Sequence, residues 1–415
     1  MVNSICMNTT ISEALATGLP VVATRHSGFP DQVKDEVNGY LANEADPEDL
    51  ASKMLEYMEH PERWGDMSKA ARAHALANYD REALIGHQLE HYKRLAPGAK
   101  KVAFIVGRFP VVSETFIINQ VADLIDRGLD VHIFTFRRGD IANVSDRYHS
   151  YEMAKRTTVL EMPNNWFLRF VHAIPKFLHV LRLRPSALPR VFNVAKYGAN
   201  TYSLKNLFWT EPFIGLDADI VHCHFGPMGV RYLMVRDVLL LAQPFVTTLY
   251  GFDVSQIVKQ KGPRYYARLI KESAYFFTMS NNMKERMVAM GFPKDKVEVL
   301  PVSVDVLGFP YRERKIVNGE TMRIISVGRF VEKKGFDDLL RATAILKKKA
   351  PRPFMLHIIG GGMLENELKA LTKELDILDV VRFEGFMKIQ DVVRFYTTAH
   401  LFVQASKTAK NGDME

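Results

Sequence analysis

The sequence predicts an α/β fold in which two doubly wound parallel sheets each carry helices on both faces. The length of 415 residues is enough for about two domains with ample core. Short apolar segments alternate with helical patterns along almost the whole chain, which is typical of parallel sheets. After the linker-like stretch at 96–99 (APGA), a new apolar segment begins at Lys101 and opens a second strand–helix series.

A helix, a tight stop and a buried strand open the chain. Thr10 to Glu13 (TISE) has the spacing of a capping box, in which a hydroxyl caps the helix start and the glutamate reaches back. Gly18 suits a left-handed helix end, and VVAT at 21–24 reads as a short buried strand that runs into a Ser-Gly loop. Ligands bind at such strand ends in open α/β sheets. Taken alone, Glu13 is explained equally well as a helix cap.

The remaining elements follow the same alternation. Asp46 and Pro47 have the chemistry of a cap and a first helical position, and residues 311–321 are polar and read as an interdomain connector. We expect helices over 47–58, 70–79, 81–95, a stretch through 121–127, 281–290, a stretch ending at 346, and 390–398. We expect strands near 40–41, 101–106, 130–136, 219–224, 245–249, 276–280, 297–302, 323–328, 355–359, 381–383 and 401–404.

Two histidines lie in the predicted strand at 219–224 (DIVHCH). We expect His222 and His224 to alternate across the strand faces, with His222 structural and His224, beside Gly226, able to reach a ligand. A metal pair would need a third ligand, and the neighbouring sequence supplies none. No metal site is therefore predicted.

The stretch at 166–209 mixes aromatic and basic residues, and two interpretations of it stay open. A basic amphipathic helix here would suit an anionic lipid surface. The alternative is a helical hairpin that packs on its own domain, and this second interpretation is favoured.

The composition is that of an ordinary globular chain with a basic balance. Hydrophobic residues make up 47% and charged residues 25% of the sequence, and Cys6 and Cys223 are its only cysteines. The formal net charge of +8 favours anionic partners, while no nucleic-acid-binding signature is present. We expect no signal peptide and no membrane span, and a reducing cytosol as the compartment.

A basic loop follows the predicted strand at 323–328. Arg329 and Lys334 stand before a helix start, where a guanidinium and an ammonium suit a pyrophosphate, and Glu332 is placed to orient the lysine. A solvated charge cluster is the alternative. No G-x-G-x-x-G or Walker lysine motif follows a strand, so the sequence does not support a dinucleotide enzyme or a P-loop NTPase.

Several of these segments resemble one family. SVGRFVEKKGFDDLLRA, HIIGGGMLENEL with VRFEGF, and ISEALATGLPVVATRHSGFPD resemble the donor-phosphate, nucleotide-base and second-glutamate segments of the family 4 glycosyltransferases, which are retaining enzymes of the GT-B fold. KVAFIVGRFPVVSETFIINQ and DIVHCHFG resemble the family's exopolysaccharide and colanic-acid branch. The resemblance implies two Rossmann-like domains that face a cleft.

The order of the segments departs from the family. In the family a GDME-like segment runs directly into the TISEALATG-like segment, whereas here GDME stands at the far end of the printed sequence. The resemblance therefore implies a circularly permuted order. Its parts are a carboxyl-terminal part of the donor-binding domain at 1–79, a crossover helix and linker at 80–100, an acceptor-side domain at 101–310, and the first part of the donor-binding domain at 311–415. The rival reading is a fusion of two truncated genes that does not close into one fold.

The resemblance assigns donor-side roles to individual positions. Arg329 and Lys334 would act on the donor diphosphate, and Glu415, which matches the first glutamate of the E-x7-E motif, would lie by the donor sugar. Uninterrupted numbering would place Ile5 at that first glutamate. The other implied donor-binding residues are Glu13, Thr9, Thr10, Gly361, Glu384 and Phe386.

On the acceptor side, one position departs from the family pattern. Many members have histidine where this chain has Tyr250, and a tyrosine cannot act as a base near neutral pH. The implied acceptor-side residues are Gly107, Ser113, Glu114, His224, Tyr250 and Asp253.

The resemblance implies a retaining, metal-independent hexosyltransferase. The donor would be a UDP- or GDP-sugar and the acceptor a lipid-linked glycan in exopolysaccharide or envelope polysaccharide synthesis. We expect no cofactor, no nucleic-acid partner, and a cytoplasmic protein that is peripheral on the inner face of the plasma membrane. Two alternatives stay open: a catalytically inactive nucleotide-sugar-binding protein of the same fold, and another GT-B enzyme such as a sugar-nucleotide epimerase.

Overall fold

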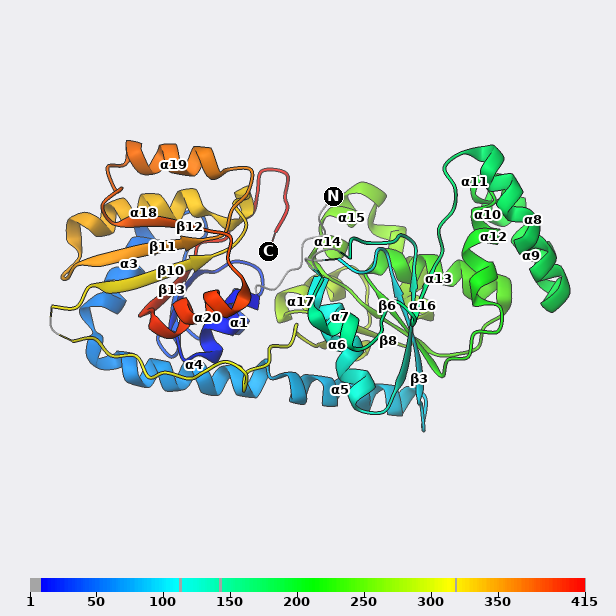
Figure 1. Ribbon diagram of the computed structural model, residues 1–415, viewed down its shortest axis with the longest axis horizontal. Helices are drawn as coiled ribbons and strands as arrows, with labels where there is room; N and C mark the ends of the chain where they lie inside the picture. The colour runs from blue at the N-terminus through cyan, green and yellow to red at the C-terminus, as the bar shows by residue number, and fades with distance from the viewer. Residues whose placement is uncertain (1–8, 112–113, 142–143, 318, 415) are drawn as a thin grey trace.

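Two parallel β-sheets lie one beside the other along the long axis of the protein (Figure 1). The computed structural model describes residues 9–111, 114–141, 144–317 and 319–414. All strand pairs of both sheets are parallel, as the alternation of apolar segments and helices predicts.

The first sheet has six strands and combines both ends of the chain. In spatial order they are β12 (Val381–Gly385), β11 (Phe354–Ile359), β10 (Met322–Val327), β13 (Leu401–Gln404), β1 (Val21–Thr24) and β2 (Gly39–Ala42). Val21 pairs with Phe402 on one side and with Gly39 on the other. The segments from the two ends of the chain therefore close into one sheet, and the reading of two fused fragments that do not close is wrong.

Helices cover both faces of the first sheet. Its helical elements are α1 (Thr9–Ala16), α2 (Phe29–Gln32), α3 (Pro47–Glu59), η1 (Pro61–Arg63), α4 (Trp64–Asn78), η7 (Glu332–Lys334), α18 (Phe336–Lys349), α19 (Glu365–Glu374) and α20 (Ile389–Thr398). One buried cluster joins α3, α18 and α19 to one face, and another joins α1, α4 and α20 to the opposite face. The amino-terminal segment therefore contributes to both cores.

The second sheet has seven strands. Their spatial order is β5 (Thr157–Val159), β4 (Asp130–Thr135), β3 (Lys101–Val106), β6 (Ile220–His224), β7 (Phe245–Thr248), β8 (Tyr275–Thr278) and β9 (Val297–Val299). Its longer helices are α5 (Arg81–Leu95), α6 (Thr115–Asp126), α8 (Trp166–Leu183), α13 (Gly226–Leu239) and α17 (Asn281–Ala289). Its shorter helical turns are α7 (Asp146–Ser150), η3 (Pro185–Ala187), α9 (Leu188–Val191), α10 (Val194–Tyr197), α11 (Ala199–Tyr202), α12 (Lys205–Thr210), η4 (Glu211–Phe213), α14 (Gly251–Val254), α15 (Gln256–Lys261), η5 (Pro263–Tyr266), α16 (Ala267–Glu272) and η6 (Lys294–Lys296).

The chain crosses between the two sheets at two adjacent points. Asp80 caps α5, and the backbones of Tyr79 and Arg81 exchange hydrogen bonds with that of Val304 at 2.9 and 3.0 Å. Beyond this crossing α5 contributes Leu84, Ile85 and Tyr92 to the core of the second sheet. The crossover helix is therefore present over 81–95 as expected, and the domain limits drawn around it stay a prediction.

Two local expectations are corrected by the structure. Helix α1 has begun by Thr9, so Thr10 lies inside the helix and is not its cap. Helix α4 begins at Trp64, earlier than expected, because Trp64 and Met67 are buried in the core with α3. In the stretch at 311–321, the buried Arg314 guanidinium donates to the carbonyls of Thr17 and Tyr396, and the role of this stretch as an interdomain connector stays a prediction.

Helices α8 to α12 form a lobe at the outer end of the second sheet, away from the first sheet (Figure 1). The stretch at 166–209 is thus helical and belongs to the second unit, as the favoured interpretation predicts. Helix α8 packs on the rest of the unit through few side chains, since only Ala173 and Val180 among its residues are buried. Within the described parts of the chain, no helix combines the length and apolar character that a membrane crossing would need.

Candidate active site

The loops that leave β10, β11 and β13 converge at the carboxyl edge of the first sheet. A Cβ atom on Gly360 would lie 1.9 Å from the Gly328 carbonyl oxygen, and one on Gly335 would lie 1.8 Å from that of Ala405. Both glycines also have positive φ, at 136° and 64°. Only glycine permits these backbones to approach so closely, so the loops form one compact surface.

Arg329 and Lys334 occupy the loop after β10, as predicted. The Arg329 side chain is exposed, and no hydrogen bond or ion pair joins its guanidinium to any other residue that the structure describes. Lys334 is buried, and its Cδ and Cε lie 3.4 Å from the position of a Cβ on Gly328. The aliphatic stem of the lysine therefore packs against the loop that carries the arginine.

Lys333 is a residue that the sequence reading missed. It is buried, its Nζ lies 3.2 Å from the Met414 carbonyl oxygen, and it lies 3.6 Å from an Asp413 carboxylate oxygen. Glu332 accepts the Lys410 N–H at 3.1 Å, so it holds the segment after β13. The sequence signal that could have identified Lys333 was its place beside Lys334 in the basic loop. A buried lysine needs an anionic partner, and the GDM segment at 412–414 supplies one.

The predicted base-binding residues form two contacts near the same edge. The Phe386 ring lies against Gly361, where a Cβ would come within 2.6 Å of the ring, and the ring is 79% exposed. Glu384 pairs with His357 Nδ1 at 2.7 Å. An exposed aromatic face beside a glycine backbone is able to stack on a planar heterocycle.

Glu13 lies between α1 and α20. The Tyr396 hydroxyl donates to Glu13 Oε2 at 3.1 Å, and burial raises the pKa of Glu13 to about 7. Thr9 and Thr10 lie half-buried in the first turn of α1. Among the described contacts, no hydrogen bond or ion pair connects Glu13 to Arg329. The hydrogen-bond partner of the Glu13 side chain is therefore Tyr396 on α20.

Two predicted site residues, Ser113 and Glu415, lie outside the residues that the structure describes. The expected proximity of Thr9 and Glu415 therefore stays a prediction. The segment that leads to the end of the described chain runs between the two sheets. The Lys333 side chain holds it from one side, and the Arg286 guanidinium on α17 approaches Met414 Sδ at 3.2 Å from the other.

At the carboxyl edge of the second sheet, Asp253 ties two loops together. Its Oδ2 accepts the N–H of Tyr250 at 2.9 Å and the N–H of Gly226 at 3.0 Å. The residue is 1% exposed, and burial raises the pKa of its carboxyl to about 7. Gly226 is required at this point, because the Tyr266 ring would lie 2.7 Å from a Cβ there. Asp253 is therefore a structural anchor beneath Tyr250.

Tyr250 and His224 form a buried pair. The Tyr250 hydroxyl lies 2.9 Å from His224 Nδ1, and His224 is fully buried, so its side chain does not reach a ligand directly. Burial lowers the pKa of His224 to about 3 and raises that of Tyr250 well above its usual range. Both side chains are neutral near neutral pH. The buried Glu114 adds to the shift of Tyr250 through its charge, and Gly107 lies beside Met228.

His222 and His224 lie on the same face of β6, which corrects the expectation of alternate faces. Residues two apart in a strand share a face, and the two rings stack with centroids 4.3 Å apart. His222 is fully buried and makes structural contacts, as expected.

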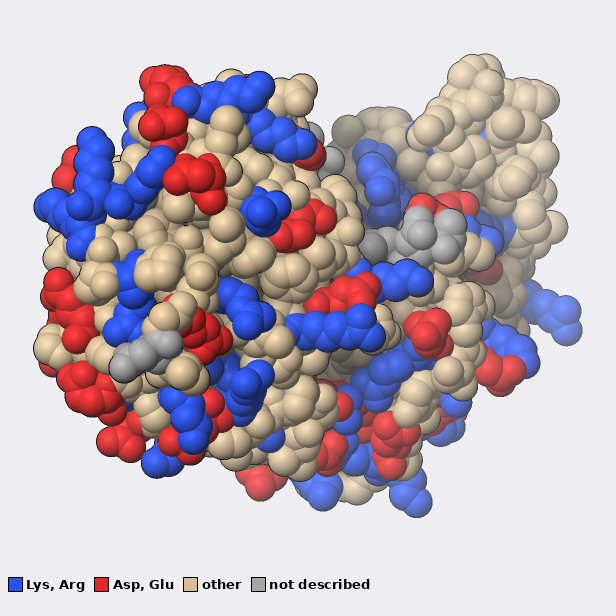
Figure 2. All heavy atoms as spheres, turned by 60° about the vertical axis from the view of Figure 1, so that its left-hand side comes forward, with Lys and Arg blue, Asp and Glu red and all other residues tan. Residues whose placement is uncertain are grey.

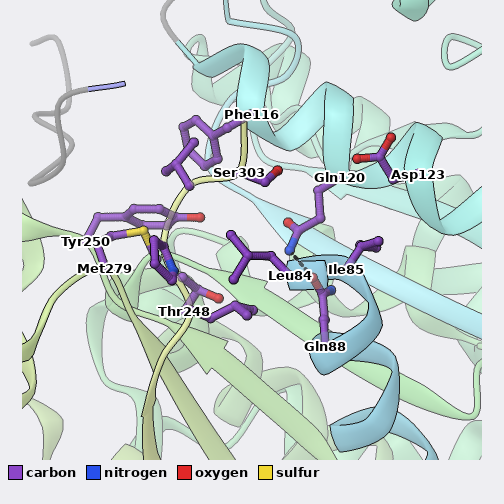
Figure 3. Close-up of a pocket in the computed structure, with 13 residues that line it drawn as sticks. Leu84, Ile85, Gln88, Phe116, Gln120, Asp123, Thr248, Tyr250, Met279 and Ser303 are labelled. Atoms are coloured by element: carbon purple, nitrogen blue, oxygen red, sulfur yellow. Dashed lines mark hydrogen bonds between the residues drawn. The ribbon is translucent and has the colours of Figure 1, made fainter. Parts of the chain in front are cut away.

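A pocket of about 460 Å³, which includes space open to solvent, adjoins this pair between α5, α6 and the ends of β7, β8 and β9 (Figure 3). Its wall contains Tyr250, Thr248, Gln120, Gln88 and Ser303. Behind the wall, hydrogen bonds connect Gln120, Gln88, Tyr92, His222 and Thr248 in that order. This network begins and ends in the pocket and fixes uncharged polar groups there.

The two units also touch across the gap between their sheets. The Asp31 carboxylate accepts the backbone N–H of Asn281 at 2.7 Å and its side-chain amide at 3.0 Å. Gln256 on α15 donates to the Asn411 carbonyl at 2.9 Å. Together with Arg286, these contacts hold the loops of the first-sheet unit opposite α15 and α17. No group of three or more His, Cys, Asp or Glu able to hold a metal ion occurs within the described ranges.

Comparisons with known proteins agree with this architecture. The family model described as "Glycosyl transferases group 1" matches two separate stretches, 8–74 and 310–412, which are the stretches that share the first sheet. The model "Glycosyltransferase Family 4" matches 113–306. One family model thus spans segments that lie far apart in this chain.

Two of the similar sequences are glycosyltransferases named for exopolysaccharide synthesis. The amylovoran biosynthesis glycosyltransferase AmsK of Erwinia amylovora is 31% identical over 322 residues, which cover 76% of this chain and 77% of that protein. WcaL of Escherichia coli (strain K12), named for colanic acid biosynthesis, is 29% identical over 319 residues, with the same coverage. Among solved structures, the lipopolysaccharide outer core galactosyltransferase WaaB aligns over 74% of each chain at 18% identity, with a TM-score of 0.47. The chain belongs to the family 4 glycosyltransferases of the GT-B fold, in a group with exopolysaccharide biosynthesis glycosyltransferases.

Proposed function

We propose that this glycosyltransferase moves a hexose from a UDP- or GDP-sugar to a lipid-linked glycan, with retention of configuration and without a metal ion. The observation that carries the proposal is the exposed Arg329 guanidinium, which has no ion pair with any described residue and stands at the meeting point of three loops. A guanidinium in this position suits a diphosphate, because it donates two parallel hydrogen bonds to phosphate oxygens.

The chemistry needs little else on the donor side. Cleavage of the sugar–phosphate bond leaves negative charge on the diphosphate, and positive groups already in place stabilise it without reorganisation. Arg329 and Lys334 would supply that charge. Phe386 and Gly361 would hold the base by stacking and by close backbone approach, and Glu13 would accept a hydrogen bond from the ribose.

The polar groups of the second edge support recognition of a sugar. The pocket beside Tyr250 is lined by hydroxyl and amide groups and by the Asp123 carboxylate, which is paired with Arg147, and such groups exchange hydrogen bonds with sugar hydroxyls. Holding one hydroxyl against the donor carbon would accelerate transfer by positioning. The lipid-linked nature of the acceptor is inferred from the group to which the chain belongs.

The test is to incubate the protein with a panel of UDP- and GDP-sugars and to measure slow hydrolysis of each donor as the release of free hexose. We expect one donor to be hydrolysed, with the anomer of the released sugar matching that of the donor and with no loss of rate in EDTA. The Arg329→Ala variant should lose this activity. If no donor binds or turns over, and Arg329→Ala behaves as the parent does, the proposal fails.

A second candidate function is binding of a nucleotide-sugar without turnover. It is favoured by Tyr250, whose phenol is buried and hydrogen-bonded to His224 at the position where the family resemblance leads us to expect histidine. Calorimetry would then show UDP or GDP binding without transfer to any acceptor. Activity that rises in Tyr250→His would identify this position as the cause.

A further inference from the structure

The polar network beside the pocket of the second sheet can be followed from atom to atom. Gln120 Nε2 on α6 donates to Gln88 Oε1 on α5, and Gln88 Nε2 donates to the Tyr92 hydroxyl oxygen at 2.6 Å. The Tyr92 hydroxyl lies 2.5 Å from His222 Nδ1, and His222 Nε2 lies 2.6 Å from Thr248 Oγ1. Figure 3 shows Gln120 and Gln88 pointing toward each other from their two helices. The five side chains therefore form one unbranched chain of hydrogen bonds.

The chain has a direction, because each group can donate only the protons that it carries. Tyr92 is buried and its hydroxyl oxygen already accepts from Gln88, so its own proton finds a partner at His222 Nδ1. Burial lowers the pKa of His222 well below its ordinary value, so the ring is neutral and carries a single proton. That proton must then lie on Nε2, from which it is donated to the Thr248 hydroxyl oxygen.

The two ends of the chain offer opposite groups to the pocket, whose wall contains both Thr248 and Gln120. Thr248 accepts from His222 and so keeps its own hydroxyl proton for another partner. Gln120 donates through Nε2 and so keeps Oε1 as an acceptor. Among the residues that the structure describes, no hydrogen bond uses either of these two groups. One end of the pocket therefore presents a donor and the other an acceptor.

The rest of the pocket wall is apolar and has no available charge. Figure 2 shows charged side chains of both signs over the outer surface of the molecule, whereas the residues described in the wall include no Lys, Arg or His. The carboxylate in the wall, Asp123, is paired with Arg147 at 2.7 Å. The apolar lining residues are Leu84, Ile85, Phe116, Met279, Leu300, Pro301 and Val302. In such surroundings a hydrogen bond is stronger than in water, and a phosphate would meet no cation in the wall.

We propose that Thr248 and Gln120 select the acceptor sugar by contacting one of its edges. Thr248 donates to a hydroxyl oxygen of the sugar, and Gln120 accepts a hydroxyl proton from it. A neutral sugar suits this pocket, because its C–H groups pack on apolar walls while its hydroxyls both donate and accept. The inference rests on the proposed function, since it takes the pocket to be the place of the acceptor.

Tyr92 and His222 are positioning residues in this arrangement. Neither lines the pocket, and both act through the groups that do. They fix which end of the chain donates, because reversing one hydrogen bond requires reversing all of them. A reversed chain would make Thr248 an acceptor and Gln120 a donor, and the pocket would then select a different edge of the sugar.

The first experiment determines the direction of the chain without any substrate. NMR of protein that carries isotope-labelled histidine reports which ring nitrogen is protonated, and the His222 signals are those that shift in both Tyr92→Phe and Thr248→Val. We expect a proton on Nε2 and none on Nδ1. A proton on Nδ1, or histidine signals that neither variant shifts, would overturn the proposal.

The second experiment measures binding of the methyl glycosides of glucose, galactose and mannose, with no sugar donor present. We expect at least one of them to bind, and Thr248→Val to weaken that binding at least about tenfold. Each hydroxyl of the bound glycoside is then replaced by fluorine, which accepts weakly and cannot donate. Fluorine should prevent binding at the position that faces Gln120 and weaken it less at the position that faces Thr248. Equal losses at every position would contradict the assigned direction.

The matched control is Thr278→Val on the neighbouring strand β8. Thr278 is fully buried, and its hydroxyl has no hydrogen-bond partner among the described residues, so this variant should bind the glycoside as the parent does. Tyr92→Phe should weaken binding, and its effect should not add to that of Thr248→Val, because both break the same chain. Thermal unfolding of the same samples shows that each variant is folded. Effects that simply add would mean that Tyr92 has no positioning role.

Donor hydrolysis, measured on the same samples, separates this inference from the proposed function. A parent that hydrolyses a donor but binds none of the three glycosides would overturn this inference alone. A parent that binds a glycoside with the expected fluorine pattern but hydrolyses no donor would overturn the proposed transfer and leave the direction of the chain in place.

Discussion

The carboxyl edges of the two sheets are built in the same way and carry opposite chemistry. At the first, Arg329 is exposed and unpaired among the described residues, beside lysines set into glycine-lined loops. At the second, His222, His224 and Tyr250 are buried, neutral and hydrogen-bonded to one another or to their neighbours. The proposed function uses this contrast. The available charge of the first edge would bind a diphosphate, and the fixed polar groups of the second edge would position a sugar.

The largest expected effect is on the charged edge. Arg329→Ala should reduce donor hydrolysis by about 10²–10³-fold, the usual loss when one preorganised donor to a developing negative charge is removed. Steady-state kinetics measures this. Arg323→Ala is the matched control, because Arg323 is an exposed arginine at the amino end of the same strand. A control that loses as much as Arg329→Ala would mean that overall charge, not the loop, binds the donor.

The next effect is on stability. A core substitution in α1 should destabilise the unit built on the first sheet and not the unit built on the second. Leu15→Ala should lower the free energy of unfolding of the first-sheet unit by about 2–5 kcal/mol, because Leu15 is fully buried there. Unfolding in denaturant, monitored by hydrogen exchange, would show which unit loses stability. Leu76→Ala on α4, where the side chain is 38% exposed, should cost less than about 1 kcal/mol. An equal loss of stability in both units would contradict the prediction that α1 stabilises only the first-sheet unit.

The stability of the second-sheet unit should depend on pH through the carboxyl of Asp253. Its carboxyl titrates at about 7 in the fold and near its ordinary value of 3.8 in the unfolded chain. Between these values the unfolded state holds fewer protons, so this group makes the fold less stable as pH rises from about 4 to about 7. The free energy of unfolding of the parent, relative to Asp253→Asn, should fall by a few kcal/mol over that range, at about 1.4 kcal/mol per pKa unit. A difference that stays flat from pH 4 to 8 would show that Asp253 is ionised in the fold.

The smallest effect concerns the contact between the two units. Asn281→Ala removes the side-chain amide bond to Asp31 but keeps the backbone one, so stability should change by less than about 1 kcal/mol. Asp31→Ala removes both bonds and should loosen the approach of the two edges, which small-angle scattering would detect. If Asp31→Ala and Asn281→Ala scatter alike, the backbone bond does not hold the units together.

The sequence predicted the first edge more completely than the second. Arg329 and Lys334 were identifiable because a strand, a basic loop and a helix start follow one another in the chain. The network through Gln88, Tyr92 and His222 was not, because Tyr92 and His222 are 130 residues apart in the chain and no local pattern links them. Lys333 was missed because two adjacent lysines look alike in the sequence, and only the fold places the Lys333 ammonium beside Asp413.

The sequence by itself determined the fold class, the limits of most strands, the crossover helix and the family, because these depend on local periodicity, caps and contiguous motifs. Only the tertiary structure decided how the two ends of the chain share a sheet, which histidine neighbours Tyr250, and which way α8 faces. Each of these depends on pairing between residues far apart in the chain. Helix α8 is the sharpest case, since its pattern does not show that Ala173 and Val180 are buried while its large apolar side chains stay exposed.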